Sequence, residues 1–150
     1  MADAPTCFLD TNIVMYAVGK EHPLKAPCAA VLRALEGSEI KAVTSVEVLQ
    51  EIVHRYQVTG RLDLAQRIVG DLKVLCEEIL PVDLVDLEQA VSLLRAYPAI
   101  SARDALHVAV MRRHGIEQIL STDRHFDDVA EIRRLDPAGS SDAEPSTNYS

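Results

Sequence analysis

Short apolar runs alternate with longer stretches of helical periodicity along this chain of 150 residues, and this alternation limits its possible folds more than any other feature. The apolar runs end at polar residues, as buried strands do, and the stretches between them repeat apolar residues every three or four positions. Strands separated by helices need crossover connections and therefore pair in parallel. We predict an α/β fold in which helices cover both faces of a mostly parallel sheet of four or five strands.

The predicted elements follow one another with short connections from residue 6 onward. The strands are expected over residues 7–9, 40–43, 78–82, 118–121 and 132–135, and the helices over 24–36, 45–58, 62–76, 83–97 and 101–115. Pro81 lies inside the third run and predicts an edge strand there, because proline cannot donate a ladder hydrogen bond. We expect one domain over residues 6–136, a frayed segment at 1–5, and a disordered tail at 137–150 that is rich in serine and proline.

Composition excludes several classes of protein. No apolar run is long enough to span a membrane, and the three cysteines, Cys7, Cys28 and Cys76, form no disulfide framework, so we expect a reduced cytoplasmic setting. The net charge of −8, from 23 acidic against 15 basic residues, argues against a broad basic face for nucleic acid. It leaves open where the acidic residues gather.

Four acidic residues are predicted to gather at one edge of the sheet. Asp10 directly follows the first strand and Asp123 the fourth, while Glu51 and Asp104 lie in the first two turns of helices that start near this edge. Parallel sheets bind ligands in the crevice beyond the carboxyl ends of their strands. Clustered carboxylates need a cation, and Mg²⁺ or Mn²⁺ prefers such oxygen ligands. The pattern is typical of metal-assisted phosphodiester hydrolysis.

Each of these acids also has a purely structural interpretation. Asp10 and Asp123 could cap the helices that follow them, and Glu51 could pair with Arg55 on a solvated face. Asp104 could complete a capping box that begins at Ser101. Capping by chance explains poorly why all four fall at the same edge of the sheet.

The sequence around these acids resembles the four acidic motifs of PIN-domain ribonucleases. The stretches that carry the resemblance are Phe8-Leu9-Asp10-Thr11-Asn12, Ser45 with Leu49-Gln50-Glu51, Asp104-Ala105-Leu106-His107, and Thr122-Asp123-Arg124-His125-Phe126. In length and order the chain is most similar to VapC-type toxins of bacterial toxin–antitoxin pairs. The resemblance extends over about residues 6–136, and the ordered set of motifs is more specific than any one of them.

The resemblance implies a three-layer α/β/α PIN fold and a toxin that acts as a Mg²⁺- or Mn²⁺-dependent endoribonuclease. It also implies a homodimer that a VapB-type antitoxin inhibits by covering the active-site groove. The implied metal-binding and catalytic residues are Asp10, Glu51, Asp104 and Asp123, with Asn12 and Thr122 in support. Glu47, one turn before Glu51, and Asp127 stay as alternative acids.

Other interpretations of the same residues are weaker. Arg124 is the basic residue we expect to contact RNA or antitoxin, and Arg103 also flanks the predicted site. An aspartyl phosphatase would need a second acid two residues after Asp10, where Asn12 stands and cannot deliver a proton. A catalytically silent binding module is favoured by loss of an acid, yet all four are present. The quartet accounts for −4 of the net charge, so half of the acidity is concentrated at the predicted site.

Overall fold

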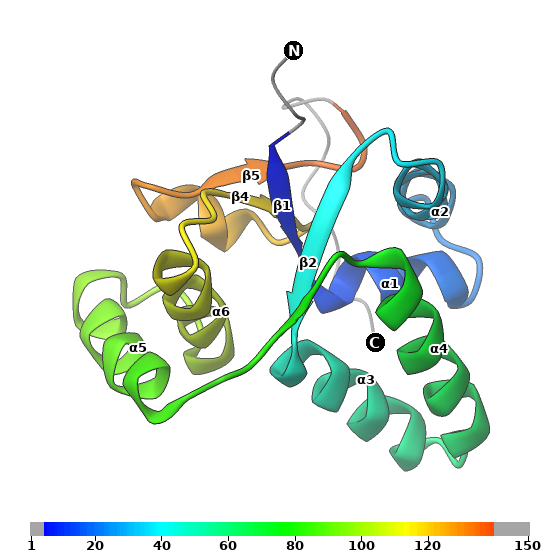
Figure 1. Ribbon diagram of the computed structural model, residues 1–150, viewed down its shortest axis with the longest axis horizontal. Coiled ribbons are helices and arrows are strands. Elements are labelled where there is room, and N and C mark those ends of the chain that lie inside the picture. The colour runs from blue at the N-terminus through cyan, green and yellow to red at the C-terminus, as the bar shows by residue number, and fades with distance from the viewer. Residues whose placement is uncertain (1–4, 140–150) are drawn as a thin grey trace.

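Five parallel strands form the central sheet of the protein in the computed structural model, which describes residues 5–139 (Figure 1). The strands are β1 (Thr6–Leu9), β2 (Lys41–Ser45), β3 (Ile79–Leu80), β4 (Gln118–Leu120) and β5 (Arg133–Leu135). Their order across the sheet is β3-β2-β1-β4-β5, and each neighbouring pair is parallel. The predicted α/β class and parallel sheet are confirmed, and β3, which precedes Pro81, lies at the edge as predicted.

Six α-helices cover the two faces of this sheet. They are α1 (Thr11–Val18), α2 (Lys25–Glu36), α3 (Val46–Val58), α4 (Leu62–Leu75), α5 (Leu84–Ala96) and α6 (Ala102–Arg113). The first four pack together on one side, and α5 and α6 pack as a pair on the other (Figure 1). The result is a three-layer α/β/α sandwich, the architecture that the sequence resemblance implies.

Helix α1 was absent from the elements predicted by periodicity. Five of its eight residues are buried, so apolar side chains surround the helix and no polar face gives a repeat of three or four. Asp10 caps it, because one of its carboxylate oxygens accepts a hydrogen bond from Thr11 N. A short 3₁₀ helix, η1 (Arg124–Asp128), follows β4 and was also not predicted.

The core is mostly aliphatic, and both phenylalanines, Phe8 and Phe126, are buried in it. Phe8, Leu9, Ile52 and Ile119 are completely buried where the sheet meets its helices. Among residues 5–139, no helix is long and apolar enough to cross a membrane. All three cysteines are buried free thiols. The expected frayed segment 1–5 and tail 137–150 lie, apart from their inner ends, outside the described residues.

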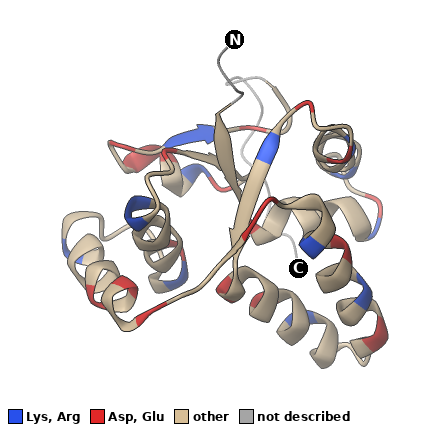
Figure 2. Cartoon of the chain, in the orientation of Figure 1, with Lys and Arg blue, Asp and Glu red and all other residues tan. Residues whose placement is uncertain are grey.

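Acidic and basic residues are interspersed over the outer helices (Figure 2). Helix α2 carries Lys25, Arg33 and Glu36, and α6 carries two arginines at its end but an aspartate in its first turn. Basic residues in this view are accompanied by acidic ones, in agreement with the net charge of −8.

Candidate active site

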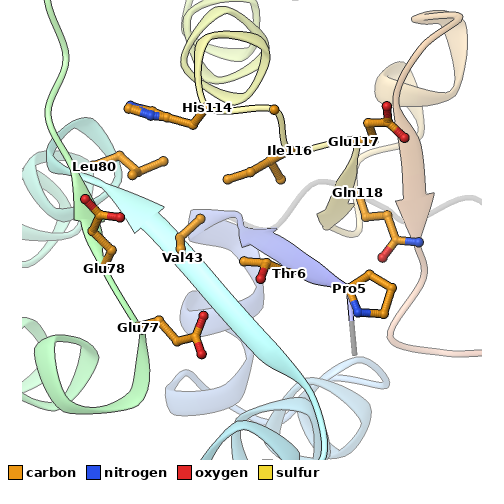
Figure 3. A pocket seen from close by; sticks show the side chains of 11 residues that line it. Pro5, Thr6, Val43, Glu77, Glu78, Leu80, His114, Ile116, Glu117 and Gln118 are labelled. Atoms are coloured by element: carbon orange, nitrogen blue, oxygen red, sulfur yellow. The ribbon is translucent and has the colours of Figure 1, made fainter. Parts of the chain in front are cut away.

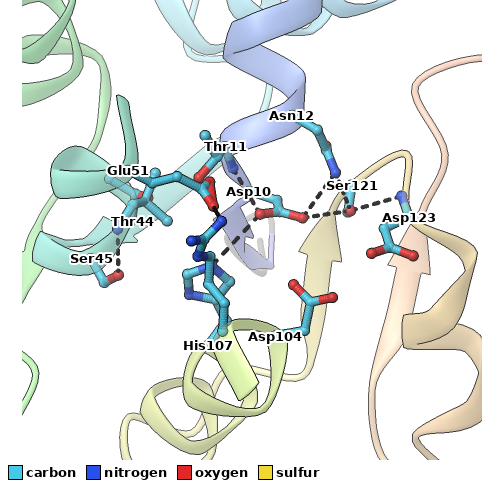
Figure 4. A network of polar contacts seen from close by, with 12 residues as sticks. Asp10, Thr11, Asn12, Thr44, Ser45, Glu51, Asp104, His107, Ser121 and Asp123 are labelled. Atoms are coloured by element: carbon cyan, nitrogen blue, oxygen red, sulfur yellow. Dashed lines mark hydrogen bonds and ion pairs between the residues drawn. The ribbon is translucent and has the colours of Figure 1, made fainter. Parts of the chain in front are cut away.

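The predicted acids meet at the carboxyl edge of the sheet, where β1 and β4 lie side by side. The chain winds from β1 outward to β3 and then returns to β4, so its direction reverses between β1 and β4. A crevice at such a reversal is the usual ligand site of an open α/β sheet. Here a cavity of about 310 Å³ is bordered by Asp10, Glu51, Asp104 and Asp123. The structure thus brings together all four acids of the predicted set (Figure 4).

Asp10 is the most firmly held of these acids. Its Oδ1 accepts a hydrogen bond from Thr11 N at 2.8 Å, and its Oδ2 accepts one from Ser121 Oγ at 2.7 Å and another from Asn12 Nδ2 at 3.1 Å. Only 5% of the residue is exposed. Burial raises the pKa of the Asp10 carboxyl above its usual range, although nearby His107 and the hydrogen bonds from Ser121 and Thr11 oppose that shift.

Asn12 and Ser121 connect the end of β1 to the loop after β4. Asn12 Oδ1 accepts a hydrogen bond from Thr122 N at 3.1 Å, and Ser121 Oγ accepts one from Asp123 N at 3.0 Å. Asp123 itself caps η1 by accepting a hydrogen bond from His125 N at 2.9 Å. The two predicted supporting residues, Asn12 and Thr122, therefore help to fix the loop that carries Asp123.

Asp104 faces the other acids from the first turn of α6. Ser101 caps this helix by accepting a hydrogen bond from Asp104 N at 3.1 Å, which leaves the Asp104 carboxylate directed into the cavity beside Asp123 (Figure 4). Burial, followed by repulsion from Asp10 and Asp123, raises the pKa of the Asp104 carboxyl to about 8. The clustered carboxyl groups therefore cannot all be ionised at neutral pH unless a cation is added.

Glu51, and not Glu47, borders the cavity with the three aspartates. Helix α3 begins after Ser45, whose hydroxyl caps it, and its second turn points Glu51 inward so that only 5% of the residue is exposed. The Glu51 carboxylate forms an ion pair with Arg103 of α6. Burial of Glu51 is inconsistent with the alternative in which it lies on a solvated face.

The two remaining predicted residues lie outside this cluster. Asp127 is exposed on η1 and forms an ion pair with Arg134 at 3.0 Å, so it points away from the cavity. Arg124 begins η1 next to Asp123 and is exposed to solvent, as a contact residue for RNA or antitoxin must be. The cavity border does not include Arg124.

Two residues outside the predicted set also belong to the site: Ser121, which the sequence did not single out, and His107, which its position three residues after Asp104 predicts to be a packing or supporting residue. Ser121 donates to Asp10 and accepts from Asp123 N; its position at the end of a predicted strand, two residues before an aspartate, was the available signal. His107 lies beneath Asp10, 1% exposed, with Nε2 3.8 Å from Asp10 Oδ1. Neither nitrogen of its ring has a hydrogen-bond partner among the described residues.

The donor set fits a hard divalent cation. Four carboxylates supply oxygen ligands, and the raised pKa of Asp104 indicates a local deficit of positive charge. Within residues 5–139, no group of three or more acidic, histidine or cysteine side chains is already arranged to hold an ion. The Glu51 carboxylate is paired with Arg103 instead.

The sequence of the chain matches known proteins over most of its length. The family profile described as the PIN domain matches residues 7–132. The chain is 44% identical over 128 residues to ribonuclease VapC13 of Mycobacterium tuberculosis, which covers 85% of this chain and 97% of that protein. It is 31% identical over 130 residues to ribonuclease VapC7 of the same organism, covering 86% and 90%.

Solved structures with low sequence identity share the fold. FitAcB from Neisseria gonorrhoeae matches with a TM-score of 0.68 at 19% identity, covering 88% of this chain and 98% of that one. VapC20 of Mycobacterium tuberculosis, described as a toxin that cleaves the sarcin–ricin loop, matches with a TM-score of 0.65 at 20% identity, covering 84% and 96%. A toxin–antitoxin complex from Klebsiella pneumoniae matches with a TM-score of 0.64 at 18% identity, covering 87% and 97%.

Proposed function

The chain belongs to the PIN domain family as a VapC-type ribonuclease toxin, and from this premise we propose that it hydrolyses RNA phosphodiester bonds at Asp10, Glu51, Asp104 and Asp123 with the help of Mg²⁺ or Mn²⁺. The observation that carries this assignment is the convergence of the four carboxylates on one cavity, together with the strongly raised pKa of Asp104. A site with such excess negative charge has little affinity for RNA until a cation neutralises it.

Each acid has a distinct part in the proposed reaction. Asp10 is the anchoring ligand, because three hydrogen bonds fix both of its oxygens before anything binds. Asp104 and Asp123 lie beside each other at the cavity and would complete the ligand set with Glu51. A bound divalent cation supplies a lowered pKa for water and stabilises the negative charge that develops on phosphorus.

The remaining residues of the site orient the acids and the RNA. Ser121 and Asn12 hold the loop of Asp123 against Asp10, so the two carboxylates keep a fixed separation. The proton of the attacking water would pass to solvent, and the leaving oxygen would take a proton from solvent as the phosphorus–oxygen bond breaks. Arg124 is exposed beside Asp123 and can contact a phosphate outside the reacting bond.

The proposed partners are a VapB-type antitoxin and a second copy of the chain. The structures that share this fold include a toxin–antitoxin complex, and large apolar side chains are exposed on helices α3 to α5, among them Val58, Leu62 and Leu84. Such side chains suit apolar contacts with another protein. The buried free thiols agree with a reduced cytoplasmic setting.

Cleavage of RNA by single-site variants tests the proposed site. Purified protein is incubated with single-stranded RNA and Mn²⁺, and the products are mapped. We expect Asp10→Asn and Asp104→Asn to abolish cleavage while circular dichroism shows an unchanged fold. Asp71→Asn, at an exposed acid of α4, is the matched control and should cleave normally.

Growth of the producing cells provides a second readout. Expression of the chain should arrest growth, and Asp10→Asn should relieve the arrest. Unchanged cleavage by both folded variants would overturn the four-carboxylate site. Cleavage that persists at full rate in EDTA would overturn the requirement for a metal ion.

A further inference from the structure

Arg103 occupies a position that helix electrostatics disfavour. It lies in the first turn of α6, where the positive end of the helix dipole repels cations and where an acid such as Asp104 is favourable. Its side chain is 49% exposed, so core packing does not explain its presence. Neither the helix dipole nor core packing explains an arginine at this position. The explanation must lie in its contact with a residue distant in the sequence.

That contact is the ion pair with Glu51, which comes from α3, 52 residues earlier in the chain. The Glu51 side chain is only 6% exposed, so the guanidinium replaces much of the hydration that the carboxylate loses. Arg103 is also the only lysine or arginine among the described residues that border the cavity. It thus provides the positive charge at Glu51 that a divalent cation would otherwise provide.

We propose that Arg103 exchanges partners during the reaction: it neutralises Glu51 in the metal-free protein and binds a phosphate of the RNA once a divalent cation takes over Glu51. This inference rests on the proposed function, since it assumes that Glu51 is a metal ligand. A divalent cation at Glu51 would neutralise that carboxylate and repel the guanidinium, so the ion pair with Arg103 would weaken. The displaced guanidinium remains at the mouth of the cavity, where its planar donors match the geometry of a phosphate.

The exchange gives Arg103 two opposite effects, which distinguish it from a residue that only supports the fold. In the metal-free protein it competes with the cation, so its removal should strengthen metal binding. With the cation bound, Arg103 contacts RNA, so its removal should weaken RNA binding and raise KM. A residue with a structural role alone would weaken both.

The experiment compares full-length wild-type protein with Arg103→Gln. Calorimetric titration with Mn²⁺ in the absence of RNA should give a dissociation constant about two- to fivefold lower for the variant, the size expected for a half-exposed ion pair. In saturating Mn²⁺, KM for a single-stranded RNA should rise several-fold with little change in kcat. The slope of log(kcat/KM) against log salt should become shallower by about 0.7, the value for one lost phosphate contact on a single strand.

Two further variants serve as controls. Arg112→Gln, at the other end of α6, removes an arginine that pairs with Glu131 and should leave both Mn²⁺ binding and the salt slope unchanged. Arg103→Lys keeps the charge but loses the planar donors, so it should retain wild-type Mn²⁺ affinity and raise KM. It also keeps the test valid if Arg103→Gln melts at a much lower temperature.

Opposite results would overturn the exchange. If Arg103→Gln binds Mn²⁺ no more tightly than wild type and keeps the full salt slope, or if Arg103→Lys keeps the wild-type KM, Arg103 has no such role. That failure is distinct from failure of the proposed function, because Asp10→Asn would still abolish cleavage. If instead Asp10→Asn cleaves normally, the proposed site itself is wrong.

Discussion

The two edges of the sheet both carry acidic residues beside a cavity, yet they differ in the volume of the cavity and in the burial of the acids. At the amino edge, a cavity of about 820 Å³ is bordered by Glu77, Glu78 and Glu117, all of them exposed (Figure 3). At the carboxyl edge, the cavity measures only about 310 Å³, but Asp10 and Glu51 are buried there. The larger cavity thus holds the acids that water already solvates.

Burial and convergence of carboxylates, and not cavity size, distinguish the edge that we propose to be reactive. Glu77 lies on the loop before β3 and has Lys41 within 3.9 Å, so solvent and a neighbouring cation stabilise its charge. Asp104 instead faces two other carboxylates, and its pKa rises to about 8. A cation that binds at the carboxyl edge would relieve this repulsion, and its binding is therefore favoured there.

The largest expected difference between the edges is in RNA cleavage. Glu51→Gln removes a proposed metal ligand and should lower the cleavage rate roughly a hundredfold or more, because a bound ion contributes several kcal/mol to transition-state stabilisation. Glu78→Gln, at the amino edge, should change the rate less than about twofold. Initial rates on a labelled RNA measure both. An equal loss in the two variants would contradict the assignment of the carboxyl edge.

The dependence of stability on pH should also separate the edges. Because the pKa of Asp104 is raised from 3.8 to about 8, the folded protein binds more protons than the unfolded chain between these values. The resulting stabilisation is present in full below pH 3.8 and is lost as pH rises through 8. We expect the free energy of unfolding of the metal-free protein to fall by about 2–5 kcal/mol over this window.

Urea unfolding in EDTA between pH 5 and pH 8 measures this dependence. Asp104→Asn should flatten it and should stabilise the metal-free protein at pH 8, since the amide carries no charge to repel. Glu117→Gln, at the amino edge, should leave the dependence unchanged. A wild-type stability that rises across this pH range would contradict the charge crowding described for the carboxyl edge.

A buried acid that is already paired with an arginine should contribute to stability and not to RNA cleavage. Asp86 of α5 is 1% exposed and accepts hydrogen bonds from Arg113 of α6 at 2.7 and 2.9 Å, which hold its pKa below the usual range. Asp86→Asn should lower the melting temperature by roughly 5 °C. The cleavage rate of this variant at low temperature should equal that of wild type. A loss of Mn²⁺ binding in the variant would contradict a purely structural role for Asp86.

The smallest expected effect concerns His107, which is buried beneath Asp10 without a hydrogen-bond partner among the described residues. His107→Leu removes no hydrogen bond and keeps a similar volume, so the free energy of unfolding should change by less than about 1 kcal/mol. Chemical denaturation measures it at pH 7. A loss of more than about 2 kcal/mol would mean that the imidazole donates to Asp10 in solution.

Sequence patterns predicted the fold well where residues act locally. The apolar runs at 7–9 and 118–121 became strands because their side chains are buried on both faces, and Ser45 and Ser101 capped the helices that follow them. Helix α1 escaped detection because it is apolar on nearly all sides, which removes the periodicity that signals a helix.

The candidate site was predicted in part, because its acids follow strand ends but its contacts are non-local. The strand-end rule alone predicts that Asp10 and Asp123 lie at one edge of the sheet. The pairing of Glu51 with Arg103 and the bridge from Ser121 to Asp10 join residues that are 52 and 111 positions apart. No local pattern encodes such partners, since only the completed sheet brings them together.

The strand order β3-β2-β1-β4-β5 has a consequence for the timing of activity during synthesis. Asp10 follows the first strand to be made, whereas Asp123 follows the fourth, so the site closes only when β4 inserts beside β1. At about 5–20 residues per second, a ribosome needs roughly 6–23 s to extend the chain from one aspartate to the other. On the proposed function, a nascent chain of this topology lacks its last proposed ligand throughout that interval, so we expect it to leave the message that encodes it intact.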